Sequence, residues 1–131
     1  MVYKKLIKKA IEAKQNAYAP YSKFSVGAAL LTKEGRVYTG CNIECASYGG
    51  TNCAERTAIF KAVSEGERDI EAIAIVSDLD GYIYPCGICR QVIKEFGDEI
   101  KIITAKSEYD FKVYTIDDLL PNSFSSKDLK K

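Results

Sequence analysis

Three cysteines and one glutamate carry the clearest chemical signal in this sequence. Cys53 is followed two residues later by Glu55, and Cys86 and Cys89 form a Cys-x-x-Cys pair. The chain contains no histidine. Three thiolates can hold a zinc ion and leave its fourth tetrahedral position for water, while a nearby carboxylate can move protons. The pattern therefore favours a hydrolytic zinc centre over a closed structural site, which would need a fourth protein ligand.

Both halves of this motif are expected at the start of a helix. An apolar stripe at helical spacing predicts one helix that ends near Gly66, with Cys53 and Glu55 in its first turn. The stripe consists of Ala54, Ala58, Ile59, Ala62 and Val63. A further helix is expected directly after Pro85, with the Cys-x-x-Cys pair at its start. The positive end of a helix lowers the pKa of a cysteine, so two such ends aimed at one point suit a thiolate site.

The remaining elements predict the scaffold that holds these helices. They are a first helix at about 3–17, a strand hairpin at 25–31 and 36–41, strands at 70–76, 100–105 and 111–114, and a short capped helix from Thr115. This order predicts an α/β fold, a three-layer α/β/α sandwich with a mixed sheet of about five strands. At 131 residues we expect a single domain spanning 1–131.

The composition narrows the class of partner. The net charge is +1, with both signs spread along the chain, so neither nucleic acid nor an anionic membrane is expected as a partner, and a small neutral ligand fits better. We see no signal peptide and no apolar run of about 18 residues, which predicts a cytoplasmic protein. Five cysteines, an odd number, indicate reduced thiols and metal ligation rather than disulfides, leaving Cys41 and Cys45 without a role.

The proposed centre needs groups that offset its charge and groups that transfer protons. Zinc with three thiolates carries a formal charge of about −1, which weakens its ability to acidify water. Arg56 and Gln91 are the candidates for drawing charge from the sulfurs. Because histidine is absent, general acid and base chemistry falls to Glu55, provided that a dry pocket and a nearby anionic centre raise its pKa.

The residues around the cysteines resemble the small cytidine deaminases. The likeness rests on the stretches 51–58 (TNCAERTA) and 85–91 (PCGICRQ) and extends through 17–24, 26–28, 40–44 and 121–124. It implies one zinc ion per subunit, held by Cys53, Cys86 and Cys89, with Glu55 as the proton shuttle during attack on C4 of cytosine. The implied reaction converts cytidine and 2′-deoxycytidine to uridine and 2′-deoxyuridine with release of ammonia, as in pyrimidine salvage.

The same resemblance implies how a nucleoside is bound within one subunit. Asn42 and Glu44 match the pair that bonds the ribose hydroxyls, and an amide with a carboxylate suits a sugar diol. Phe24 matches an aromatic side chain that packs against the pyrimidine. The backbone amide of Ala54 and the carbonyl of Tyr84 are expected to face the base and its exocyclic amine.

The resemblance also implies an assembly. The small members of this family form homotetramers, and Tyr48 and Phe124 are expected to reach the site of a neighbouring subunit. Two features depart from the usual family pattern: Cys45 stands where asparagine is usual, and the loop before the motif contains Gly49 and Gly50. Glycines can loosen a loop that borders the pocket and the subunit interface.

Several alternatives compete with this interpretation. Cys41 or Cys45 would complete a structural zinc site, and Cys86 with Cys89 has the spacing of a thiol redox pair, although neither explains Glu55. Among deaminases, the substrate could be another cytosine nucleoside such as blasticidin S. A base in single-stranded nucleic acid is disfavoured, because editing enzymes use a basic path for the strand and usually a histidine ligand.

Overall fold

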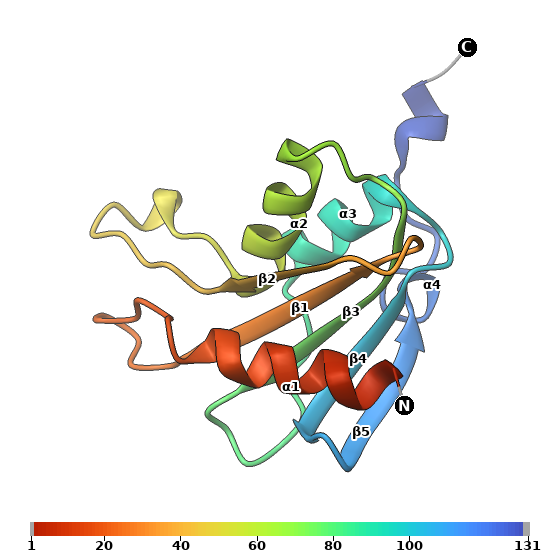
Figure 1. The fold of residues 1–131 in the computed structure, drawn as a ribbon. Coiled ribbons are helices and arrows are strands. Elements are labelled where there is room, and N and C mark those ends of the chain that lie inside the picture. The colour runs from red at the N-terminus through yellow and green to blue at the C-terminus, as the bar shows by residue number, and fades with distance from the viewer. Residues whose placement is uncertain (1, 130–131) are drawn as a thin grey trace.

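A five-stranded mixed sheet forms the centre of the computed structural model, which describes residues 2–129. The strands are β1 (Val26–Thr32), β2 (Val37–Cys41), β3 (Ile70–Ser77), β4 (Lys101–Ser107) and β5 (Asp110–Thr115). They lie in the order β2-β1-β3-β4-β5 (Figure 1). β3 and β4 are parallel, and the other neighbouring pairs are antiparallel. This confirms the predicted mixed sheet.

Helices cover the sheet on both faces, which confirms the predicted three layers (Figure 1). They are α1 (Val2–Lys14), α2 (Ala54–Ser64), α3 (Gly87–Phe96) and α4 (Ile116–Leu119), with 3₁₀ turns at Tyr48–Gly50 and Ser126–Leu129. α1 lies alone on one face, while α2, α3 and α4 share the other. α4 begins with the predicted capping box, in which Thr115 and Asp118 bond each other's backbone amides.

The two faces of the sheet have separate hydrophobic cores because side chains alternate along each strand. In β1, Ala29 belongs to the core beneath α1, with Ile7 of that helix. Its neighbours Ala28 and Leu30 belong to the core beneath α2 and α3, with Ile59. All five residues are at most 1% exposed. The alternation fixes which strand residues face the helices that carry the cysteines.

Gly40 lets α2 pack unusually close to β2. A methyl group added there would lie 2.5 Å from both the Ala54 carbonyl oxygen and the Ala58 amide nitrogen. Both contacts are backbone atoms of α2, so they cannot rotate away. Because Gly40 has no side chain, the first turn of α2 can lie close to β2. Gly40 therefore sets how near to the sheet the residues of this turn are held.

Two loops project together beyond one end of the sheet (Figure 1). The first helix ends at Lys14 rather than near Ala17, because the chain leaves the helix to pair with the second loop. The Tyr18 amide donates to the Asn42 carbonyl at 3.0 Å, and the Glu44 amide donates to the Tyr18 carbonyl at 2.9 Å. A local helical preference thus gives way to a contact 24 residues distant.

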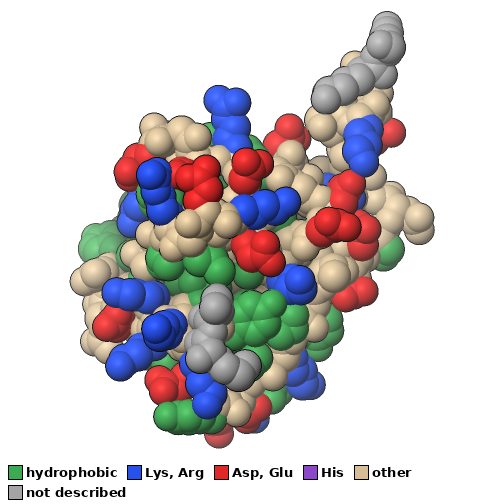
Figure 2. Space-filling view, turned by 45° about the vertical axis from the view of Figure 1, so that its right-hand side comes forward, with side chains coloured by type: hydrophobic (Ala, Val, Ile, Leu, Met, Phe, Trp, Pro, Cys, Tyr) green, Lys and Arg blue, Asp and Glu red, His purple; other side chains and the backbone are tan. Residues whose placement is uncertain are grey.

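The surface shows a mixed distribution of charge. In Figure 2, lysine and arginine side chains alternate with aspartate and glutamate over the visible face. Within residues 2–129, no helix combines the length and the apolar composition needed to cross a membrane.

Candidate active site

The three cysteines of the motif meet where two helices begin. β2 and β3 are both antiparallel to β1, so their carboxyl ends lie at the same end of the sheet. The chain leaving each of these strands leads into a helix whose N-cap is a cysteine, Cys53 for α2 and Cys86 for α3. Neither side chain caps its own helix. Both sulfurs are therefore free to face a common point, together with Cys89 from the first turn of α3.

The sulfur positions fit a zinc ion. The three Sγ atoms all lie within 4.8 Å of one another, and those of Cys53 and Cys86 are 3.7 Å apart. Zinc–sulfur bonds of about 2.3 Å in a tetrahedron set two sulfurs about 3.8 Å apart, so this pair already has the required separation. Three thiols also form a suitable donor set for zinc. We conclude that Cys53, Cys86 and Cys89 form one zinc site per subunit.

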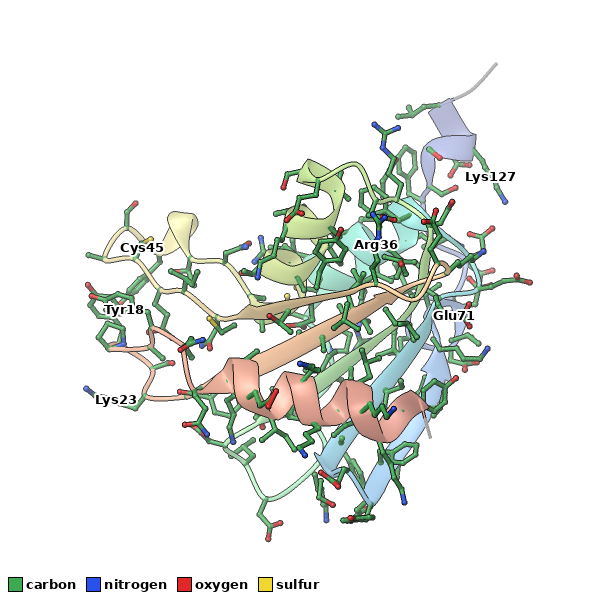
Figure 3. The ribbon with its side chains drawn as sticks, viewed as in Figure 1. Tyr18, Lys23, Arg36, Cys45, Glu71 and Lys127 are labelled. Atoms are coloured by element: carbon green, nitrogen blue, oxygen red, sulfur yellow. The ribbon has the colours of Figure 1, made fainter. Side chains whose placement is uncertain are left out.

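The remaining cysteines do not complete that site. Cys41 and Cys45, both within the described part of the chain, lie outside the three-sulfur group. The Cys45 sulfur faces the Gly50 carbonyl at 3.6 Å. Figure 3 shows Cys45 and Tyr18 on the two neighbouring loops that project from the sheet. Neither remaining cysteine supplies the fourth ligand that a closed structural zinc site would need.

Arg56 is a positively charged residue in contact with the cluster. Its Nη2 donates to the Cys53 sulfur at 3.4 Å. Hydrogen bonds from the Cys89 thiol, from Arg56 and from the Cys86 thiol lower the pKa of Cys53 to about 5. The hydrogen bond with Cys53 and burial raise the pKa of Cys89, because negative charge is already concentrated on its neighbour. The guanidinium is therefore placed to offset the charge that several thiolates would share.

Glu55 is buried beside the sulfurs. The residue is only 4% exposed, and burial raises the pKa of its carboxyl group to about 7. The nearby negative charge of Cys53 acts in the same direction, while a backbone hydrogen bond, the Cys89 thiol and Arg56 oppose it. A carboxyl group with a pKa near neutrality can both accept and release a proton at physiological pH, as general acid–base chemistry requires.

Asn42 and Glu44 lie at the base of the two projecting loops and hold them together. The Asn42 side chain accepts from the Val26 amide at 2.9 Å and donates to the Phe24 carbonyl at 2.8 Å. The Glu44 carboxylate accepts from the amides of Tyr21 and Ser22, at 3.0 and 3.1 Å, and from the Ser22 hydroxyl. These hydrogen bonds lower the pKa of Glu44.

A cavity of about 360 Å³ opens beside the Glu44 carboxylate. Its walls are Tyr21, Ser22, Glu44, Tyr48 and Thr51, and the rings of Tyr21 and Tyr48 meet edge to face. No role was predicted for Ser22 from the sequence, because its partner Glu44 lies 22 residues further along the chain. A larger cavity of about 720 Å³ lies at the opposite end of the sheet, far from the sulfurs.

The other predicted site residues occupy different surroundings. Ala54 is fully buried next to Cys53, and Phe24 packs partly buried against the α2 and α3 core. The Gln91 amide donates to the Phe124 carbonyl at 2.7 Å and thus contacts the chain near the C-terminus instead of a sulfur. The side chains of Tyr48 and Phe124 are 75% and 58% exposed.

Comparison with known proteins extends the similarity over nearly the whole chain. Residues 2–105 match the family described as the cytidine and deoxycytidylate deaminase zinc-binding region. A cytidine deaminase from Halalkalibacterium halodurans is 53% identical over 125 residues, covering 95% of each chain. The crystal structure of cytidine deaminase from Burkholderia pseudomallei superposes with a TM-score of 0.90 at 48% identity, covering 95% of this chain and 100% of the other.

A relative with a different named substrate is more distant. The blasticidin-S deaminase of Bacillus cereus is 32% identical over 112 residues, covering 79% of each chain. The sequence similarity is thus greater to proteins named for cytidine.

Proposed function

Since this chain belongs to the cytidine and deoxycytidylate deaminase family, we propose that it hydrolyses cytidine and 2′-deoxycytidine to uridine and 2′-deoxyuridine with release of ammonia. The observation that carries this proposal is the buried carboxylate of Glu55 beside a three-sulfur zinc site. A structural zinc site would use a fourth protein ligand and would gain nothing from burying a carboxylate against its sulfurs.

Glu55 is the group that moves protons. Zinc held by Cys53, Cys86 and Cys89 supplies, when bound, a Lewis acid that lowers the pKa of water. Glu55 takes one proton from the water as its oxygen attacks C4 and delivers this proton to the ring nitrogen N3. It then takes the second proton from the new C4 hydroxyl group and delivers it to the departing amine. The C4–N bond breaks, a C4=O bond forms, and ammonia leaves. The carboxylate, with its pKa near 7, returns to its starting state after each cycle.

The groups around Glu55 set its working conditions. Arg56 offsets part of the negative charge of the Cys53 thiolate through its 3.4 Å contact. The sulfurs then donate less charge to a bound zinc ion, which can lower the pKa of water more strongly. We assign Gln91 an indirect part, because its side chain bonds the Phe124 carbonyl and thereby ties the C-terminal segment to α3.

The nucleoside is proposed to lie between the sulfurs and the base of the projecting loops. Phe24 packs against the pyrimidine, while the Ala54 amide and the Tyr84 carbonyl face its polar atoms. Asn42 and Glu44 bond the ribose. This is compatible with their present bonds, since the Asn42 amide keeps one unused N–H and the Glu44 carboxylate keeps unused lone pairs.

We further propose that four chains assemble, with Tyr48 and Phe124 completing neighbouring sites. Exposed apolar side chains on the projecting loops support an interface there. They are Tyr18, Tyr21, Ile43 and Tyr48, each at least 42% exposed. Mass photometry or light scattering of the purified protein should give the mass of four 14.5 kDa chains, and a monomer would contradict this part of the proposal.

The cellular setting is proposed from composition. Five cysteines, an odd number, suit a reducing compartment, so we place this single-domain protein in the cytoplasm. Its similarity to cytidine deaminases supports a role of the reaction in pyrimidine salvage.

One experiment tests the reaction directly. Purified protein is incubated with cytidine, 2′-deoxycytidine, blasticidin S and a cytosine-containing single-stranded oligonucleotide, and ammonia release is followed with the loss of cytosine absorbance. We expect turnover of the first two, loss of turnover after chelation, and its return with zinc. Absence of ammonia from every substrate by the zinc-loaded protein would contradict the proposal, and turnover of blasticidin S alone would reassign the substrate.

A further inference from the structure

The segment that joins β3 to α3 carries two groups of the proposed site near its end but makes few backbone hydrogen bonds. Residues 78–86 contain neither helix nor strand and lead directly to the Tyr84 carbonyl and the Cys86 sulfur. Within residues 2–129, the backbone–backbone hydrogen bonds outside helices and strands include none from residues 79–85. At its far end, Arg90 donates to the Pro85 carbonyl at 2.7 Å. Side chains must therefore hold the middle of this segment.

Two tyrosines fasten the segment to the β4–β5 hairpin. The Tyr82 hydroxyl donates to the Asp110 carboxylate, and the Tyr82 ring lies 5.1 Å from the Lys106 ammonium and 4.5 Å from that of Lys112. The Tyr84 ring meets the Tyr114 ring edge to face, with centroids 5.7 Å apart and hydroxyls at 3.2 Å. These contacts combine charge-assisted hydrogen bonding, cation–π attraction and aromatic packing.

Side chains alternate with the same spacing in β5 and in this segment, so they contact one another in successive pairs. Asp110, Lys112 and Tyr114 are spaced by two in β5, so their side chains share one face of the sheet. Tyr82 and Tyr84 have the same spacing, while Ile83 between them packs against the α2 and α3 core. The segment thus lies extended across the edge of the sheet, and in Figure 1 it passes beside the turn between β4 and β5.

We propose that Tyr82 and Tyr84, with Asp110 and Tyr114 on β5, are positioning residues that hold the Tyr84 carbonyl and Cys86 in place. Edge strand β5, which contributes no metal ligand, thereby controls both metal retention and contact with the exocyclic amine. The part concerning the amine rests on the proposed function. The part concerning Cys86 rests on the sulfur cluster alone.

The test removes two hydroxyl groups and leaves Tyr84 unchanged. The double variant Tyr82→Phe with Tyr114→Phe is compared with Tyr109→Phe, which removes a hydroxyl from the same hairpin at a side chain that is 75% exposed. We expect faster amide hydrogen exchange in the peptide covering 78–86 and zinc release to a chelator about tenfold faster in the double variant. Tyr109→Phe should match the wild type in both measurements.

Steady-state kinetics separate positioning from mere destabilisation. A shifted carbonyl weakens binding of the nucleoside, so the double variant should show a raised KM for cytidine with kcat largely kept. Partial unfolding would instead lower the active fraction, and so kcat, at unchanged KM. Restoring Tyr82 alone should recover part of the exchange protection.

Two outcomes would overturn the inference. Exchange and zinc release equal to those of Tyr109→Phe would show that the tyrosines do not hold the segment. A fall in kcat alone at unchanged KM would overturn the part concerning the amine. If the wild type deaminates nothing while exchange and zinc release still rise in the double variant, the proposed function fails and the positioning of Cys86 stands.

Discussion

Glu55 and Glu44 are almost equally hidden from solvent, at 4% and 9% exposure, yet their pKa values move in opposite directions. Glu55 is enclosed by helix and sheet beside sulfurs, where burial without enough donors raises its pKa to about 7. Glu44 is covered by the loop that it holds, and hydrogen bonds from Ser22 and Tyr21 keep its pKa low. Low exposure alone therefore does not decide whether a carboxylate stays charged: desolvation deep in the protein raises the pKa of Glu55, whereas Glu44 lies near the surface and has hydrogen-bond donors that lower its pKa.

The same contrast extends to the two regions around these residues. The sulfur cluster is built on two helix N-termini pressed against the sheet, so the backbone sets its geometry. The pocket beside Glu44 is formed by two projecting loops that are held together by the side-chain hydrogen bonds of Glu44 and Asn42 and by the backbone hydrogen bonds of Tyr18. Changes in the first region should therefore affect chemistry and overall stability, and changes in the second should affect loop order.

The largest effect is expected from Glu55→Gln, which removes the proton carrier and keeps the shape. We expect kcat for cytidine to fall by about 10²- to 10⁴-fold, with zinc content unchanged, because general acid–base catalysis contributes on that order. Ammonia release and metal analysis provide the measurements.

Glu67→Gln is the matched control for this change. Glu67 is another carboxylate at 9% exposure, but it pairs with Arg36 at 2.6 Å outside the sulfur cluster. Its variant should keep wild-type kcat. Full activity in Glu55→Gln would contradict the assignment of Glu55 as the group that carries the protons.

An intermediate effect is expected from Gly40→Ala. The added methyl group would press on two backbone atoms of α2 at 2.5 Å, and overpacking of this kind costs about 1–3 kcal/mol of unfolding free energy. Urea unfolding checks this. Gly49→Ala, where an added methyl meets nothing within 4 Å, should unfold close to the wild type. Equal unfolding free energies of the wild type and both variants would show that α2 can move away from β2 at little cost, and that Gly40 does not set their distance.

The smallest effect is expected from Glu44→Gln, and it should depend on pH. The lowered pKa means that the charged carboxylate stabilises the folded state at pH values above its ordinary pKa, near 4.5. That stabilisation is lost as the pH falls through the lowered value. The difference in unfolding free energy between wild type and variant should thus be full at pH 7 and shrink toward pH 3. A difference independent of pH would mean that the charge of Glu44 does not hold the loop.

Much of the scaffold followed from sequence because local patterns coincide with tertiary packing. The predicted strands at 70–76 and 100–105 match β3 and β4 within two residues, since their apolar runs are buried on both faces. The helix starts at Cys53 and Cys86 were likewise predictable from the stripes that follow them. The first helix was predicted too long because the bonds of Tyr18 to a distant loop were not visible in its local sequence.

The candidate site was predictable in its chemistry and less so in its supports. Cysteine spacing and the position of Glu55 identify the metal centre, whereas the roles assigned to Phe24 and Phe124 remain predictions. That Glu44 bonds Ser22, and that Tyr82 bonds Asp110, could not be foreseen. Such pairs depend on which loops the strand order brings together, and no local spacing encodes them.

The separation of the ligands along the chain gives the cysteines a second consequence. Cys53 and Cys86 are 33 residues apart, and α2 and α3 share few direct contacts. A bound metal therefore closes a long loop and restricts the unfolded chain, as a cross-link would. In the chain-entropy description, closing a loop of this length is worth roughly 3–4 kcal/mol. A chain without its ion lacks this link between two helices, so we expect the metal-free protein to unfold more readily than the metal-bound protein.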